Sequence, residues 1–242
     1  MKKLNHTSRR NAATYLLVIL VFIVLQLLRG AGAISSIMQG LLVPICAYVV
    51  MAISLNLTVG ILGELSLGHA GFMSMGAFTG VTAAIALQNA VPSAPLRLAI
   101  SMAIGAGFAA LAGFLIGIPV LRLKGDYLAI VTLAFGEIIK SIFNNLYVGM
   151  DSTGLHMSML SDQTNLDDTG KLIISGPMGI GGIQKISTFT AGFVLILIAL
   201  AVVFNLVNSR AGRAIMSIRD NRIAAESVGI HITRYKMMAF VI

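Results

Sequence analysis

Long apolar runs limit what this chain can fold into. A helix needs about 20 mostly apolar residues to cross the hydrocarbon core of a bilayer, and runs of this kind recur through the sequence. The chain is 57% hydrophobic and 11% charged, whereas soluble domains are about half apolar and about a quarter charged. The sequence therefore predicts an all-α polytopic membrane protein surrounded by membrane lipid.

Six windows predict complete transmembrane helices, because each is apolar or nearly so throughout. They cover residues 12–28, 34–59, 70–87, 98–120, 127–147 and 188–207. A seventh apolar run begins at Tyr235, and the sequence stops at Ile242 before that run could cross a membrane. We therefore expect residues 1–242 to form a single transmembrane domain that is truncated at its C-terminus.

The basic residues predict how these spans are oriented. Cytoplasmic loops of membrane proteins are enriched in Lys and Arg. If the N-terminus is cytoplasmic and the spans alternate, the cytoplasmic segments hold most of the basic residues. The external segments then hold Arg29, Arg97, Lys171 and Lys185. The net charge of +8 reflects this topology, and no nucleic-acid partner is expected.

The connection from residue 148 to residue 187 is external in this orientation. It contains Asp151, Asp162, Asp167 and Asp168 among several Gly, Ser and Thr residues, a mildly acidic and turn-rich composition. A loop of this length is uncommon unless it has a function or is disordered. It is therefore either a docking surface for an external partner or a flexible cover.

The segment from residue 209 to residue 234 is a polar, basic loop on the cytoplasmic side. Asp220 is well placed to cap the N-terminus of a helix, and Gly229 to end that helix in a left-handed conformation. A short helix is therefore predicted from about residue 221 to residue 228. Its apolar strip would contain Ile223, Ala224, Ala225 and Val228. A structured helix in a tight loop between spans suggests a docking surface for another protein.

Polar groups interrupt two of the apolar regions. Glu137 and Lys140 share a helix face in the fifth span, so they either neutralise each other or belong to a solute path. Residues 56–71 contain four glycines and several polar side chains. These polar side chains include Glu64, Ser66 and His69. Irregular backbone at membrane depth must be buried by protein or border a water-filled cavity, so this segment is either a re-entrant element or an ordinary cytoplasmic loop with a helix cap.

The sequence lacks the motifs of several kinds of site. It has no Gly-x-x-x-x-Gly-Lys-Ser/Thr stretch, so the chain cannot itself bind ATP through a phosphate-binding loop. The lone Cys46 excludes an intrachain disulfide and a metal site built from several cysteines. We expect neither enzymatic activity nor a bound cofactor.

Three stretches carry a family resemblance. Residues 63–71, 125–138 and 212–230 read GELSLGHAG, GDYLAIVTLAFGEI and GRAIMSIRDNRIAAESVGI. In this order and spacing they resemble the M-type inner-membrane permease subunit of bacterial branched-chain amino acid ABC transporters. The resemblance runs from about Ala47 to the end, and members of this family continue with further spans after the corresponding loop.

The resemblance implies a multi-pass protein of the bacterial inner (plasma) membrane that moves branched-chain or related amino acids inward. It implies a second permease subunit of the related H type, two cytoplasmic ATPase subunits and an external solute-binding protein. ATP would be used by the ATPase subunits, and this chain itself would bind no cofactor.

The resemblance also makes residues 212–229 the coupling element, which docks in a groove of the ATPase. Importer permeases often show Glu-Ala-Ala-x-x-x-Gly here. The matching residues are Ala224, Ala225 and Gly229. Ile223 replaces the Glu, so Glu226 or Asp220 is the acid available for its usual contact. The residues expected to dock the ATPase are Arg213, Arg219, Asp220, Arg222, Ala224, Ala225, Glu226 and Gly229.

For the solute path we expect Ser66, His69, Thr132 and Glu137. The alternative function is a secondary transporter or channel that is coupled to protons through Glu137, Glu64 or His69. The two readings differ in their energy source, which is ATP hydrolysed by partner subunits in the first and a proton gradient in the second.

Overall fold

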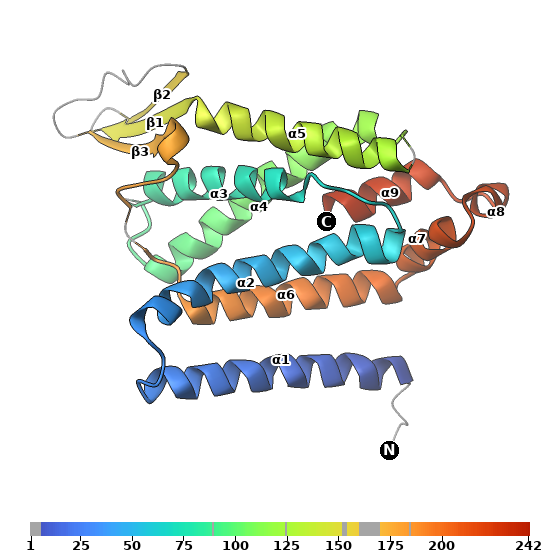
Figure 1. Cartoon of the computed structure of the whole chain (residues 1–242), viewed down its shortest axis with the longest axis horizontal. Helices are drawn as coiled ribbons and strands as arrows, with labels where there is room; N and C mark the ends of the chain where they lie inside the picture. The colour runs from blue at the N-terminus through green and yellow to red at the C-terminus, as the bar shows by residue number, and fades with distance from the viewer. Residues whose placement is uncertain (1–5, 89, 124, 152–153, 160–169, 184) are drawn as a thin grey trace. The chain divides into compact units, whose positions relative to one another are not determined.

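The computed structural model describes residues 6–88, 90–123, 125–151, 154–159, 170–183 and 185–242 (Figure 1). The helices are α1 (His6–Gly30), α2 (Ser36–Asn56), α3 (His69–Ala86), α4 (Ala94–Val120), α5 (Asp126–Asn144), α6 (Phe189–Asn208), α7 (Arg210–Asp220), α8 (Arg222–Ser227) and α9 (Ile232–Val241). A π-helical stretch, η1 (Leu57–Leu62), follows α2 directly, and η2 (Gly176–Met178) is a 3-10 turn. The strands are β1 (Leu146–Asp151), β2 (Gly154–Met159) and β3 (Lys171–Ser175).

Four helices in the described part of the chain are long and apolar enough to cross a membrane. They are Asn11–Gly30, Ser36–Leu62, Ala94–Val120 and Phe189–Asn208, and they coincide with four of the six predicted windows. The other two windows form α3 and α5, of 18 and 19 residues. Gly, Ser and Thr dilute the hydrophobicity of α3, while α5 carries Asp126, Glu137 and Lys140. The chain is thus an all-α polytopic membrane protein with a small β-sheet.

The fifth predicted span is shorter than expected. The window extends to Tyr147, whereas α5 ends at Asn144 and β1 begins at Leu146. The side-chain amide of Asn145 donates a hydrogen bond to the Ser141 carbonyl at 2.8 Å, which satisfies an acceptor at the helix end. The apolar residues that follow are buried in a sheet instead of continuing the helix.

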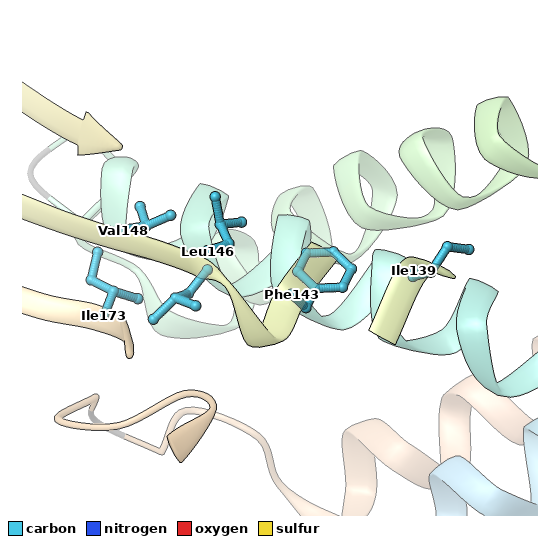
Figure 2. Packing of buried hydrophobic residues seen from close by; sticks show 6 residues of the cluster. Ile139, Phe143, Leu146, Val148 and Ile173 are labelled. Carbon is cyan, nitrogen blue, oxygen red and sulfur yellow. The ribbon is translucent and has the colours of Figure 1, made fainter. Parts of the chain in front are cut away.

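The three strands form an antiparallel sheet in the order β2-β1-β3. Figure 2 shows its core, in which Ile139 and Phe143 of α5 meet Leu146 and Val148 of β1 and Ile173 of β3. This part of the predicted external connection is therefore ordered and packed on α5. Asp162, Asp167 and Asp168 lie outside the described residues.

The chain divides into two compact units. The first comprises residues 1–56 and 187–213, and the second residues 57–186 and 214–242. In the first unit α2 packs against α6. A Cβ atom placed on Gly192 would lie 2.8 Å from Cβ of Cys46, so this glycine lets the two helices approach closely. The free thiol of Cys46 is buried in this contact.

Small residues also bring α3 and α4 together in the second unit. A Cβ atom on Gly105 would lie 2.5 Å from the Gly76 carbonyl oxygen, and one on Gly80 would lie 3.3 Å from the Ser101 carbonyl oxygen. These distances show that Gly76, Gly80 and Gly105 let α3 and α4 pack closely. On α5, Gly136 takes the same role, because a Cβ atom on Gly71 would lie 3.0 Å from its Cα.

The substitution Gly105→Ala is expected to destabilise the protein, because the new methyl group collides with the backbone of α3. Overpacking of this kind costs about 1–3 kcal/mol. Gly107→Ala is the matched control, since a Cβ atom at Gly107 meets nothing within 4 Å. Thermal unfolding of the detergent-solubilised protein should show a lower Tm for Gly105→Ala and an unchanged or higher Tm for Gly107→Ala. Equal Tm values for the two variants would contradict this packing.

Candidate functional site

The polar loop forms two helices, α7 and α8, whereas the sequence predicted one short helix. Asp220 is the last residue of α7 and does not cap the following helix, which corrects the prediction. α7 extends this far because Ile215 and Ile218 are buried on one face, as in an amphipathic helix.

Asn221 caps α8 instead. Its Oδ1 accepts a hydrogen bond from the Ala224 N–H at 3.1 Å, and Asn is as good a cap as Asp. At the other end Gly229 has φ +85°, and the Ile230 N–H donates to the Ala225 carbonyl at 3.1 Å. This is the hydrogen bond of a Schellman motif, so the predicted stop at Gly229 is confirmed.

One edge of α8 is apolar and exposed. Ile223 is 81% exposed and Val228 is 76% exposed. Ala225 is buried and forms a cluster with Ile218 and Ile232, so it lies in the core of the loop and not on its surface. Ile223 on α8 and Val228 at its C-cap make this edge of the loop a candidate contact surface.

Most of the other residues expected to dock the ATPase lie on the surface of the loop. The exposed ones are Arg213, Asp220, Ala224, Glu226 and Gly229, and Arg222 is half-buried. The remaining one, Arg219, is also exposed, but its guanidinium contacts this chain. The surface that a partner could touch is therefore made mainly by α8 and by the end of α7.

Arg219 contacts the segment between α2 and α3. Its Nη1 donates a hydrogen bond to the Gly60 carbonyl at 3.0 Å, and its Nη2 lies 3.3 Å from Oδ1 of Asp220. A Cβ atom on Gly63 would lie 2.5 Å from Cγ of Arg219, and Gly63 has φ +78°. Glycine is therefore required at position 63 for its conformation and for the space it leaves. No local sequence pattern indicated the contact between Arg219 and residues 60–63.

A buried ion pair joins the same segment to α9. Lys236 Nζ contacts Oε1 of Glu64, and the side chain of Lys236 is 2% exposed. Lys236 follows Tyr235 at the start of the predicted seventh apolar run, on the side of the membrane that holds most of the basic residues, and the sequence analysis did not pair it with Glu64. The available signal was Glu64 itself, because an acid in apolar surroundings needs a partner.

Residues 57–68, called here the interrupted segment, link α2 to α3 without a regular α-helix. The Leu67 N–H donates to Thr132 Oγ1 at 3.0 Å, and a Cβ atom on Gly68 would lie 2.8 Å from the Thr132 carbonyl oxygen. Together with the contacts of Arg219 and Lys236, these place the segment against α5, α7 and α9. It is thus packed by protein, as a re-entrant element requires.

Three buried polar atoms in this region have no hydrogen-bond partner among the described residues. They are Oε2 of Glu64, Oγ of Ser66 and Nδ1 of His69. Buried polar atoms are nearly always paired, so these three atoms, here called the buried polar cluster, are candidates for contacts with a further group. Thr132, which is 1% exposed, lies beside this cluster through its bond to Leu67.

Glu137 is separate from the cluster. Its carboxylate lies 3.2 Å from Lys140 Nζ, and the two side chains are 63% and 65% exposed. The structure thus brings Ser66, His69 and Thr132 into one region and leaves Glu137 on the exposed face of α5. The two charges pair with each other, as one of the two sequence interpretations requires, and a role of this pair in a solute path stays a prediction.

Several long apolar helices, an interrupted segment between two of them and a helical polar loop define a polytopic membrane protein. The chain belongs to the family described as "Branched-chain amino acid transport system / permease component", whose model matches residues 37–242. It is a permease-family protein, and this family places it among transporter components and not among enzymes.

Two relatives carry the name high-affinity branched-chain amino acid transport system permease protein LivM. The chain is 33% identical to the Salmonella typhimurium protein and 34% identical to the Escherichia coli protein, over 205 residues in each case. These matches cover 81% of this chain and 47% of each relative. The chain thus spans about half the length of the curated relatives it matches. No solved structure matches it significantly.

The Glu64–Lys236 pair makes a testable prediction about stability. Removing one partner leaves an unpaired buried charge, which costs about 3–5 kcal/mol, whereas replacing both by neutral groups of similar volume is often close to neutral. Glu64→Gln and Lys236→Met should therefore each lower the Tm of the solubilised protein more than the double variant does. Additive losses in the double variant would show that the two side chains do not interact.

Proposed function

We propose that the chain is the transmembrane permease subunit of an ABC importer, which moves branched-chain or related amino acids into the cell. Its family membership and the exposed apolar edge of α8 support this function. The two LivM relatives are permease proteins of branched-chain amino acid transport systems. The chain would lie in the bacterial inner membrane with its N-terminus in the cytoplasm.

The proposed assembly contains a second permease subunit, of the related H type, together with two cytoplasmic ATPase subunits and an external solute-binding protein. ATP is hydrolysed by the ATPase subunits, and this chain binds no cofactor. The sheet β1–β3, on the predicted external side, is a surface that the solute-binding protein could touch. Met178, which follows it, is 89% exposed.

α8 is proposed to dock the ATPase. Ile223 stands where importers often have an acid, and its exposure supports an apolar contact in place of a salt bridge. Arg222 and Glu226 flank it and would set the register of docking, because charges at the rim of an interface select the partner's orientation. To drive transport, α8 must bind the two states of the ATPase pair differently.

The solute path is proposed to include Ser66, His69, Thr132 and Glu137. The buried cluster around Ser66 offers polar groups next to apolar helices, as an amino acid requires. Charged side chains exposed to lipid are costly, so the α5 face with Glu137 and Lys140 is proposed to border the second permease subunit, where the solute crosses.

The energy source separates this function from the proton-coupled alternative. In cells that express the whole transport system, the chain should co-purify with the ATPase subunit, and uptake of labelled leucine should stop when ATP is depleted. Uptake should survive collapse of the proton gradient while ATP is maintained. Absence of the ATPase, together with uptake that follows the proton gradient, would identify a secondary transporter instead.

The variant Ile223→Lys tests the docking surface, because it removes the apolar side chain without restoring the acid that importers often have here. Loss of a central apolar contact at an interface costs about 2 kcal/mol or more, so the yield of co-purified ATPase should fall at least tenfold. Because Ile223 is 81% exposed, folding should be unaffected. Met178→Lys is the matched control, since this side chain is as exposed but lies outside the loop. Normal ATPase yield with Ile223→Lys would exclude α8 as the docking element.

A further inference from the structure

We propose that Arg219 is a positioning residue that transmits movement of the docked α8 to the interrupted segment in the membrane. The sequence placed Arg219 on the ATPase-docking surface, whereas its guanidinium faces residues 60–63 of its own chain. The inference rests on the proposed docking of α8 and adds the route by which docking reaches the spans.

α7, α8 and α9 are tied together around α8. Ile218 of α7, Ala225 of α8 and Ile232 of α9 form one buried cluster, against which Ile230 and Tyr235 also pack. The Schellman hydrogen bond from Ile230 to Ala225 joins the end of α8 to the start of α9. Because close-packed side chains do not slide freely past one another, a partner that displaces α8 must also displace its two neighbours.

Each neighbour of α8 holds the interrupted segment. Arg219 lies on α7, two residues before the N-cap residue of α8, and donates a hydrogen bond to the Gly60 carbonyl. Lys236 on α9 forms an ion pair with Glu64. The two contacts are therefore made to positions four residues apart in the segment. A displacement of α8 would reach the segment from both sides of the loop.

The Arg219 contact fits closely. A hydrogen bond from a charged donor is stronger than a neutral one, and the aliphatic part of the side chain lies where Gly63 has no Cβ atom. α7 cannot shift at this point without moving residues 60–63 or breaking the contact. The far end of the segment is bonded to α5 by the Leu67 N–H, so the movement would arrive next to Ser66 and Thr132.

Arg219→Ala is the first test, made on the complete transport system with its ATPase, second permease and binding protein. ATPase yield should stay normal, while leucine uptake falls roughly tenfold, the effect of losing one charged hydrogen bond. ATP hydrolysis should also lose its response to the loaded binding protein. Arg219→Lys keeps a donor and should retain intermediate uptake.

If Arg219→Ala lowers the yield of co-purified ATPase together with uptake, Arg219 is a docking residue. If Arg219→Ala leaves uptake unchanged, Arg219 has no role in transmitting the movement. Either result overturns this inference and leaves the proposed importer intact. The proposed importer function is contradicted only if the ATPase does not co-purify with the wild-type chain. The two negative results are therefore distinguishable.

Gly63→Ala tests the same contact from the other side. The new methyl group would displace Arg219, so uptake should fall, and Arg219→Ala in the same chain should add little, because the two changes remove one interaction. Gly125→Ala is the matched control, since Gly125 also has positive φ, at +57°, but a Cβ atom there meets nothing within 4 Å. Additive losses at positions 63 and 219, or an equal loss with Gly125→Ala, would overturn the inference.

Discussion

A backbone polar group that is buried without a partner costs free energy, and the second unit depends on how the interrupted segment meets that constraint. At this point the regular helical hydrogen bonding ends. The partners come from distant parts of the chain, namely the guanidinium of Arg219 for the Gly60 carbonyl and the hydroxyl of Thr132 for the Leu67 N–H. The second unit is therefore organised around a segment that has little structure of its own.

Glycine makes this organisation possible, because a residue without a Cβ atom leaves room for a neighbouring side chain or backbone to approach closely. Gly63 makes room for Arg219, Gly68 for the backbone at Thr132, and Gly71 for α5. All three lie in or next to the interrupted segment, in the motif that first indicated the family. The same device brings α3 against α4 through Gly105, so that helices with few large side chains still form a packed unit.

The sequence predicted the features that depend on local pattern. Apolar runs indicated the helices, and Gly229 indicated the end of α8. The start of α8 was predicted one residue too early for a local reason. Asp220 and Asn221 are equally good N-cap residues, and only the length of α7 decides which of them caps α8. The sheet was not predicted, since Leu146 and Val148 continue an apolar run that is equally compatible with a helix.

The contacts that link the site together could not be predicted in this way. Arg219 and Gly60 are 159 positions apart, and Lys236 and Glu64 are 172 positions apart. The pairing has a consequence for biogenesis. At about 5–20 residues per second, Glu64 leaves the ribosome many seconds before Lys236 exists. The interrupted segment is therefore synthesised with an uncompensated acid, and it cannot reach its final form until the last helix of this sequence has been synthesised.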